Sequence, residues 1–198
     1  MRKKTARTER DSGVQDTVVL ATLKVIGRMG LAGVTHRAVA DEAGLSLGAV
    51  TYYCRTRDDL VDAALQSAVD REARRLEALS ARLKQDDFTT APQWIEHLGR
   101  WYADELKDNA DVHLACYEAF LAAARSEKHQ QKVAALQQAW ERTAEVALTA
   151  AGISSAADRA GIFVAALMGI LLEELALPRR GTFARVSSKL TRLIEGWT

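Results

Sequence analysis

The chain is poor in the residues that build several large classes of fold. Only 2 prolines, 12 glycines and 2 cysteines occur among its 198 residues. Strand-favouring runs of β-branched and aromatic residues are also missing, which disfavours sandwiches, barrels and doubly wound sheets. Two cysteines cannot form a disulfide framework, so a reducing, cytoplasmic location is expected. The longest apolar run, residues 162–172, is too short to cross a bilayer.

Residues with high helix propensity, above all alanine and leucine, dominate the sequence, which predicts an all-α fold. Charge is balanced overall, with 27 basic and 26 acidic residues, but it is unevenly distributed. Residues 1–60 carry ten Lys and Arg against seven Asp and Glu, whereas residues 61–198 carry 17 against 19. This modest excess favours a polyanion contact in the first third of the chain. Residues 1–11 are polar and basic, so we expect a disordered arm there.

Three short helices are predicted within residues 12–55. Each begins at a hydroxyl that can cap a helix, and two are followed by glycines that can turn the chain. The cap candidates are Ser12, Thr35 and Ser46, and the turn glycines are Gly30, Gly33 and Gly44. Neither of the last two helices is long enough to persist alone, so both must pack on the first. Short helices separated by a glycine-containing turn are typical of a helix-turn-helix head.

Residues 56–198 are predicted to form a larger helical bundle. A long connecting helix is predicted over residues 56–84, and its start is marked by Thr56, Asp58 and Asp59. The threonine hydroxyl can cap the helix, and carboxylates in the first turn interact favourably with the helix dipole. Five further helices are expected, over residues 91–107, 111–126, 129–151, 155–177 and 182–196.

The segment from Gly33 to Leu60 resembles the DNA-binding region of TetR/AcrR-family transcriptional regulators, and the resemblance covers roughly residues 14–62. The matching elements, in order and without gaps, are Gly33, Thr35, Arg37, Val39-Ala40, Ala43-Gly44, Ser46, Gly48, Tyr52-Tyr53 and Arg57-Asp58-Asp59-Leu60. The resemblance implies a homodimer whose two recognition helices, each starting after Ser46, enter successive major grooves of a palindromic operator. The basic arm is then either a solubilising tail or a minor-groove contact.

The resemblance also assigns roles within the head. The residues expected to contact DNA bases or the adjacent DNA backbone are His36, Arg37, Leu47, Gly48 and Ala49. Those expected to contact DNA phosphates are Thr35, Tyr52, Tyr53 and Arg57. Ser46 caps the recognition helix, and Thr51 stands where the family usually has tyrosine. The apolar character of Leu47 and Ala49 favours a readout based on thymine methyl groups and on Arg37.

Aromatic and polar residues in the body recur on shared helical faces, which indicates either core packing or a ligand cavity. The candidates for a small-molecule site are Trp94, His97, Trp101, His113, Cys116, Tyr117, Phe120, Trp140 and Met168. The apolar helix that contains residues 162–172 and the amphipathic helix after it are predicted to form a dimer interface, two helices from each subunit, with core packing as the alternative. The interface candidates are Ala165, Gly169, Leu172, Val186, Leu190 and Leu193.

The resulting hypothesis is a sequence-specific repressor that a small molecule releases from its operator. Two alternatives remain open: an architectural protein that binds DNA without sequence preference, and a helical carrier or enzyme with an accidental match. No catalytic signature is recognisable, and the scattered histidines and cysteines predict no metal site or cofactor.

Overall fold

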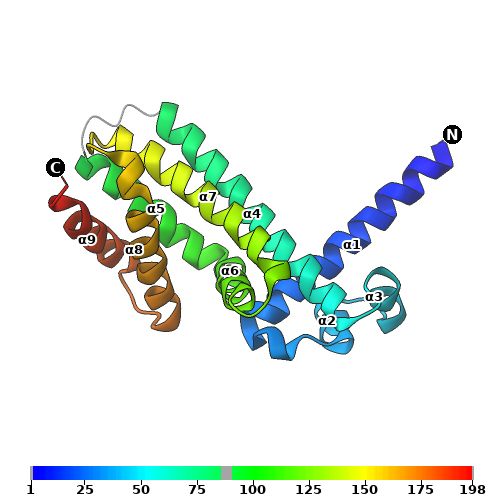
Figure 1. The fold of residues 1–198 in the computed structure, drawn as a ribbon. Coiled ribbons are helices and arrows are strands. Elements are labelled where there is room, and N and C mark those ends of the chain that lie inside the picture. Colours follow the sequence, from blue (N-terminus) through cyan, green and yellow to red (C-terminus); the bar gives the residue numbers. More distant parts are fainter. Residues whose placement is uncertain (1, 86–90, 198) are drawn as a thin grey trace. The chain divides into compact units, whose positions relative to one another are not determined.

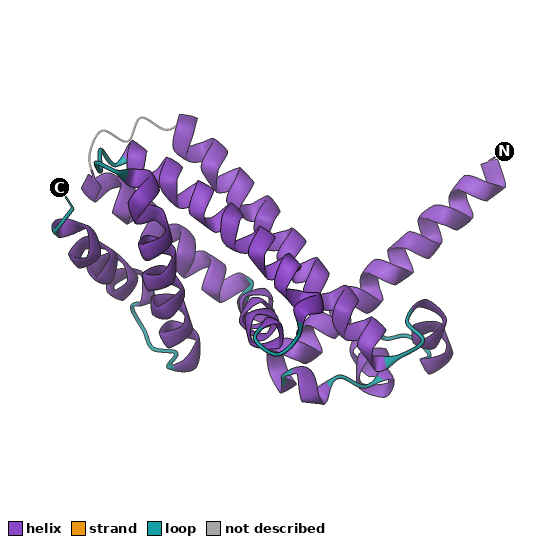
Figure 2. Cartoon of the chain, in the orientation of Figure 1, coloured by secondary structure: helices purple, strands orange, loops and turns teal. Residues whose placement is uncertain are grey.

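The computed structural model describes residues 2–85 and 91–197, and within that part of the chain every regular element is a helix (Figures 1 and 2). The elements are α1 (Arg2–Met29), the short 3-10 turn η1 (Leu31–Gly33), α2 (His36–Ala43), α3 (Leu47–Tyr53), α4 (Arg57–Gln85), α5 (Ala91–Asp108), α6 (Ala110–Ala123), α7 (Glu127–Ala150), α8 (Ala156–Ala176) and α9 (Thr182–Glu195). The predicted all-α fold is therefore confirmed. From α4 onward, each helix begins and ends within three residues of its predicted bounds.

The first helix is longer than expected. Residues 2–11 belong to α1, where the sequence suggested a disordered arm and a helix start at Ser12. Arginine, lysine, alanine and glutamate are good helix formers, and no proline or glycine interrupts residues 2–11. The helix therefore continues through the capping signal at Ser12 instead of beginning there.

The chain divides into two compact units. The first contains residues 1–71 and 111–132, and the second contains residues 72–110 and 133–198. This division differs from the boundary expected at residue 56, because the first half of α4 and most of α6 cluster with the head.

The first unit has a core of aliphatic side chains from α1 to α4. Val18 and Ile26 of α1, Val39 of α2, Val50 of α3 and Leu60 of α4 are all fully buried. These contacts hold the short helices in place, as their length requires. Two reciprocal hydrogen bonds start α4: the Asp59 amide donates to the Thr56 hydroxyl at 3.1 Å, and the Thr56 amide donates to the Asp59 carboxylate at 2.8 Å.

Helix α6 lies against α1 at a glycine. A β-carbon placed on Gly27 would come within 2.8 Å of the backbone Cα of Asp111, in the first turn of α6. The absence of a side chain at Gly27 is therefore what allows the two helix backbones to approach this closely.

The second unit has its own hydrophobic core, formed by α5, α7, α8 and α9 together with Leu79 of α4. Trp94 is fully buried there, and its ring lies 5.6 Å from the ring of Phe163. Helix α9 packs along α5 and also contacts α8. None of the described helices is both long enough and apolar enough to traverse a lipid bilayer.

Candidate nucleic-acid interface

The turn between α2 and α3 is fixed by local hydrogen bonds. The Thr35 hydroxyl accepts from the Ala38 amide at 3.1 Å, and the Ser46 hydroxyl accepts from the Ala49 amide at 3.2 Å. Between the two helices, Gly44 adopts the left-handed conformation, with φ at 65° and ψ at 30°. Glycine adopts this conformation without the steric cost that a β-carbon brings. The three predicted signals therefore operate as expected.

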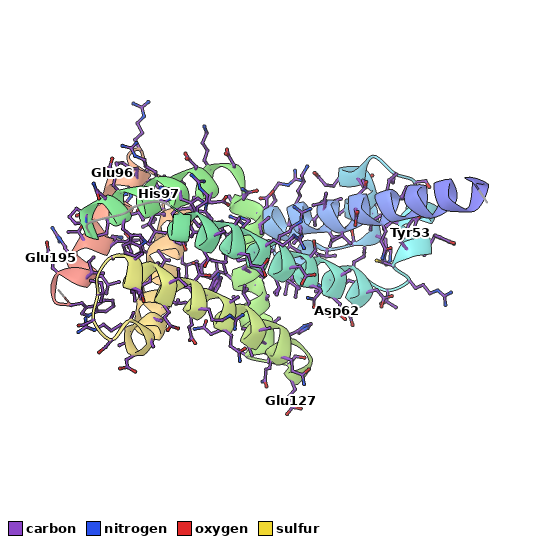
Figure 3. All side chains as sticks on the ribbon, turned by 90° about the horizontal axis from the view of Figure 1, so that it is seen from above. Tyr53, Asp62, Glu96, His97, Glu127 and Glu195 are labelled. Atoms are coloured by element: carbon purple, nitrogen blue, oxygen red, sulfur yellow. The ribbon has the colours of Figure 1, made fainter. Side chains whose placement is uncertain are left out.

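Helix α3 is buried on one side only. Val50 faces the core of the first unit with no exposed surface, whereas Leu47 is 49% exposed and Tyr52 is 73% exposed. Gly48 and Thr51 are also exposed. Tyr53, labelled in Figure 3, is half-buried and meets Tyr52 edge to face at 5.1 Å. The helix thus presents a mixed apolar and hydroxyl-bearing face that its own unit leaves uncovered.

Gly48 lies on this uncovered face, and the fold itself does not require a glycine there. A β-carbon at Gly48 would meet no atom within 4 Å, and the residue has an ordinary helical conformation. Glycine inside a helix is less favourable than alanine by about 1 kcal/mol. The packing of the head therefore does not account for the lack of a side chain at this position.

Two of the predicted DNA-contacting residues make contacts inside the head. The ring Nε2 of His36 lies 2.9 Å from the carbonyl oxygen of Cys54, and the guanidinium of Arg57 donates to the carbonyl oxygens of Leu31 (2.5 Å) and Val34 (3.1 Å). His36 thereby joins α2 to the end of α3, and Arg57 joins α4 to the loop before α2. Arg37 and Thr35 are exposed.

Ion pairs and a buried thiol also stabilise the head formed by α1 to α3. Glu42 of α2 pairs with Arg28 and Lys24 of α1, and the hydrogen bond from Arg28 is the main cause that lowers the pKa of Glu42. Cys54 is buried behind α3, and burial, reinforced by the nearby Asp59 carboxylate, raises the pKa of its thiol. The buried thiol therefore acts as a small apolar side chain.

Two family models match the chain. Residues 18–64 match the one described as bacterial regulatory proteins, tetR family, and residues 89–196 match the Tetracyclin repressor-like, C-terminal domain. Together they cover the head and more than half of the chain.

The chain belongs to the TetR family of bacterial regulatory proteins.

Solved structures of TetR-family proteins agree with this. A member from Streptomyces coelicolor A3 is 31% identical, with a TM-score of 0.66, over 91% of this chain and 97% of that one. The multidrug binding protein EbrR complexed with imidazole is 30% identical, with a TM-score of 0.62, over 90% of this chain and 93% of that one. The HTH-type transcriptional regulator PksA of Bacillus subtilis (strain 168) is 37% identical over 62 residues, which span 31% of this chain and 30% of that relative.

In this TetR-family chain, the predicted ligand-binding residues are divided between the two units. His113, Cys116, Tyr117 and Phe120 belong to the first unit, and Trp94, His97, Trp101, Trp140 and Met168 belong to the second. His113 and Cys116 are buried, and Tyr117 and Phe120 are half-buried. Trp94 lies in the middle of the second core, while Trp101, Trp140 and Met168 pack at its edge.

A hollow of about 240 Å³ lies in the second unit, and none of those nine residues lines it. It is bounded by the end of α5, the end of α8 and the start of α9. Glu174 contributes to its wall and accepts hydrogen bonds from Nε and one terminal nitrogen of the Arg185 guanidinium, which lower the pKa of Glu174.

The predicted interface residues also separate into two groups. Val186 and Leu190 have no exposed surface, because α9 buries this face within its own subunit, and Leu193 is half-buried beside them. This corrects the expectation that Val186 and Leu190 face a second copy. Ala165, Gly169 and Leu172 are exposed on α8, and Ile162, which the sequence reasoning did not select, is 61% exposed on the same helix.

Sequence reasoning missed one further cluster, formed by charged residues of α4 and α5. Glu72 is 2% exposed, and Arg75 of the next turn pairs with both Glu72 and Glu105. No local signal distinguishes these residues from the solvated charges of an amphipathic helix.

Proposed function

We propose that the protein is a ligand-responsive transcriptional repressor that binds a palindromic operator as a homodimer, without catalysis. The observation that carries this proposal is the uncovered face of α3. It exposes Leu47, Gly48, Thr51 and Tyr52 on a helix whose opposite side is anchored by Val50. A major groove about 12 Å wide admits one such helix.

The second subunit is proposed to dock on α8. Ile162, Ala165, Gly169 and Leu172 recur at helical spacing and form an exposed apolar face, which a partner helix would cover. Two such subunits would place their recognition helices about 34–36 Å apart, the separation of successive major grooves on one side of the duplex.

Regulation is proposed to follow a population shift. EbrR, the relative crystallised with imidazole, proflavin and ethidium, is described as a multidrug binding protein. We infer that this chain also binds a small molecule in its body, and that binding favours a conformation in which α4 is tilted and the two heads lose their spacing. The ligand acts only through its differential affinity for the two conformations.

Fluorescence anisotropy tests this function directly. Labelled DNA from upstream of the protein's own gene is titrated with full-length protein at several salt concentrations, alongside scrambled DNA of the same composition. A specific complex with a steep salt dependence supports the repressor. Equal affinity for scrambled DNA would indicate an architectural protein, and no binding at all would indicate a carrier.

A further inference from the structure

The uncovered face of α3 consists of four residues. An α-helix has about 3.6 residues per turn, so Gly48 and Tyr52 lie opposite the buried Val50. Leu47 and Thr51 lie next to each other on one flank of that line. All four of these residues are exposed, which agrees with this placement. They form the outward face of α3.

Leu47 and Thr51 are the apolar pair on this face. The sequence alone favoured Leu47 and Ala49, but Ala49 is half-buried and lies on the other flank of the helix. The Thr51 hydroxyl donates to the carbonyl oxygen of Leu47, one turn earlier, at 2.9 Å. This hydrogen bond restricts the threonine to rotamers in which its oxygen faces its own helix.

Hydrogen-bond donors are scarce on the outward face. The proton of the Thr51 hydroxyl is engaged with Leu47, and the Ser46 hydroxyl accepts from the Ala49 amide as the helix cap. Residues 45–54 contain no Arg, Lys, Asn, Gln, Asp or Glu. These are the side chains that discriminate bases by directed hydrogen bonds in the major groove. The side chains of α3 are therefore poorly suited to a hydrogen-bonded readout.

The chemistry that Leu47 and Thr51 offer is that of methyl groups. On base-pair edges in the major groove, the corresponding apolar group is the C5 methyl of thymine. Gly48 contributes no side chain that would hold the helix away from the base pairs. The surroundings suit DNA, since residues 43–57 contain Arg55 and Arg57 but no acidic residue.

We propose that α3 reads thymine methyl groups, with Leu47 contacting one thymine and Thr51 a second in each half of the operator. This proposal rests on the proposed function, because it identifies bases that the operator must contain. The two residues are one turn, about 6 Å, apart along the helix, so the two thymines lie within about three base pairs of each other. Burial of one methyl group favours binding about fourfold.

Uracil substitution tests the bases. Selection from a randomised pool of duplexes with the full-length protein first identifies the operator. Each thymine is then replaced in both half-sites by deoxyuridine, which removes only the C5 methyl group. Fluorescence anisotropy should show two positions per half-site at which the affinity falls about fourfold for each methyl group removed. A selected operator without thymine, or equal affinity for uracil at every position, would overturn the proposal.

Two substitutions of Thr51 separate its methyl group from its hydroxyl. Thr51→Ser removes the methyl group and keeps the donor to the Leu47 carbonyl, whereas Thr51→Val keeps a methyl-bearing branched side chain and removes that donor. Thr51→Ser should bind thymine and uracil equally at one of the two positions, and Thr51→Val should still prefer thymine there. The reverse pattern would mean that the hydroxyl reads the base, which would overturn the proposal.

Leu47→Ala should remove the preference for thymine at the second position. The control is Leu121→Ala, because Leu121 of α6 is also an exposed leucine, at 53%, and it should leave both preferences unchanged. Circular dichroism melts identify any variant that fails to fold, in which case the variant of the other residue decides. A folded Leu47→Ala that keeps the preference at both positions would exclude Leu47 from the readout and overturn the proposal.

The pool selection separates this inference from the proposed function. A pool from which no sequence is enriched would remove the sequence-specific repressor, and the thymine readout with it. An enriched operator that is bound equally well with thymine and with uracil would remove the thymine readout and leave the repressor.

Discussion

The ring Nε2 of His36 lies 2.9 Å from the carbonyl oxygen of Cys54, so the first residue of α2 is joined to the end of α3. A carbonyl oxygen only accepts, and this ring nitrogen must therefore carry the proton. The contact sets the position of α3 relative to α2, which gives His36 a structural role in the head.

Replacement of His36 by alanine should lower the free energy of unfolding by about 1 kcal/mol, because the Cys54 carbonyl loses its partner. Urea unfolding measures this loss. Operator selection from a randomised pool should return the same base preferences for the variant as for the native protein. A changed preference at one base position would instead restore His36 as a base-reading residue.

Two glycines of the head should respond in opposite ways to alanine. Gly48→Ala should leave the stability unchanged or raise it by up to about 1 kcal/mol, because the added methyl group meets no neighbour, yet it should weaken operator binding. Gly44→Ala should lower the stability by about 1–2 kcal/mol, because its φ of 65° disfavours a β-carbon. Thermal melts and anisotropy measure the two effects. Undiminished operator affinity in Gly48→Ala would mean that DNA does not approach this residue closely.

Arg57→Ala should affect both folding and DNA binding. The Leu31 and Val34 carbonyls lose the hydrogen bonds from Arg57, and binding to all DNA sequences should weaken alike, with a salt slope lower by about 1. Arg57→Lys is the matched control, because it keeps the charge but cannot reproduce the fork geometry. It should retain the salt slope and lose stability. A sequence-selective loss in Arg57→Ala would contradict a phosphate contact.

Replacement of Gly169 by tryptophan should disrupt the proposed dimer. Gly169 is exposed on α8, where a β-carbon meets nothing within its own subunit, so the folded monomer should tolerate the change. Analytical ultracentrifugation measures the shift toward monomer. Ala135→Trp, at an exposed position on α7 of the same unit, is the control and should remain dimeric. Dimers of unaltered stability in Gly169→Trp would exclude this residue from the interface.

The Glu174–Arg185 pair should contribute stability that depends on pH. Because the hydrogen bonds from Arg185 lower the pKa of Glu174 in the folded state, the stabilisation is present above the unfolded-state pKa and is lost as pH falls through the folded-state value. Glu174→Gln should therefore reduce the free energy of unfolding at neutral pH by about 1–3 kcal/mol. Urea unfolding at neutral and acidic pH should show that this difference shrinks in acid. A constant difference would mean that the charge of Glu174 is not responsible.

Most of the fold could be predicted because its signals are local. Thr35, Ser46 and the Thr56–Asp59 pair cap their helices with neighbours three residues away, so the sequence contains the complete interaction. The start of α1 could not be predicted in this way. Ser12 can cap a helix, but the residues before it also favour helix, so α1 begins earlier, at Arg2.

The partners of apolar and buried faces could not be predicted from periodicity. Periodicity identifies Val186, Leu190 and Ile162 as apolar positions, but it does not say which neighbour covers each of them. Similarly, Glu72 has the pattern of a solvated helix residue, and its burial depends on Trp140, which lies 68 positions away in the sequence.

The contact between Gly27 and Asp111 has a mechanical consequence. Because Gly27 has no side chain, α1 packs directly against the backbone and side chain of Asp111, and such close packing leaves little room to absorb a small shift between α1 and α6. A movement at the start of α6 is therefore passed directly to the helix on which α2 and α3 are packed. A single methyl group added at position 27 would therefore force α1 and α6 apart.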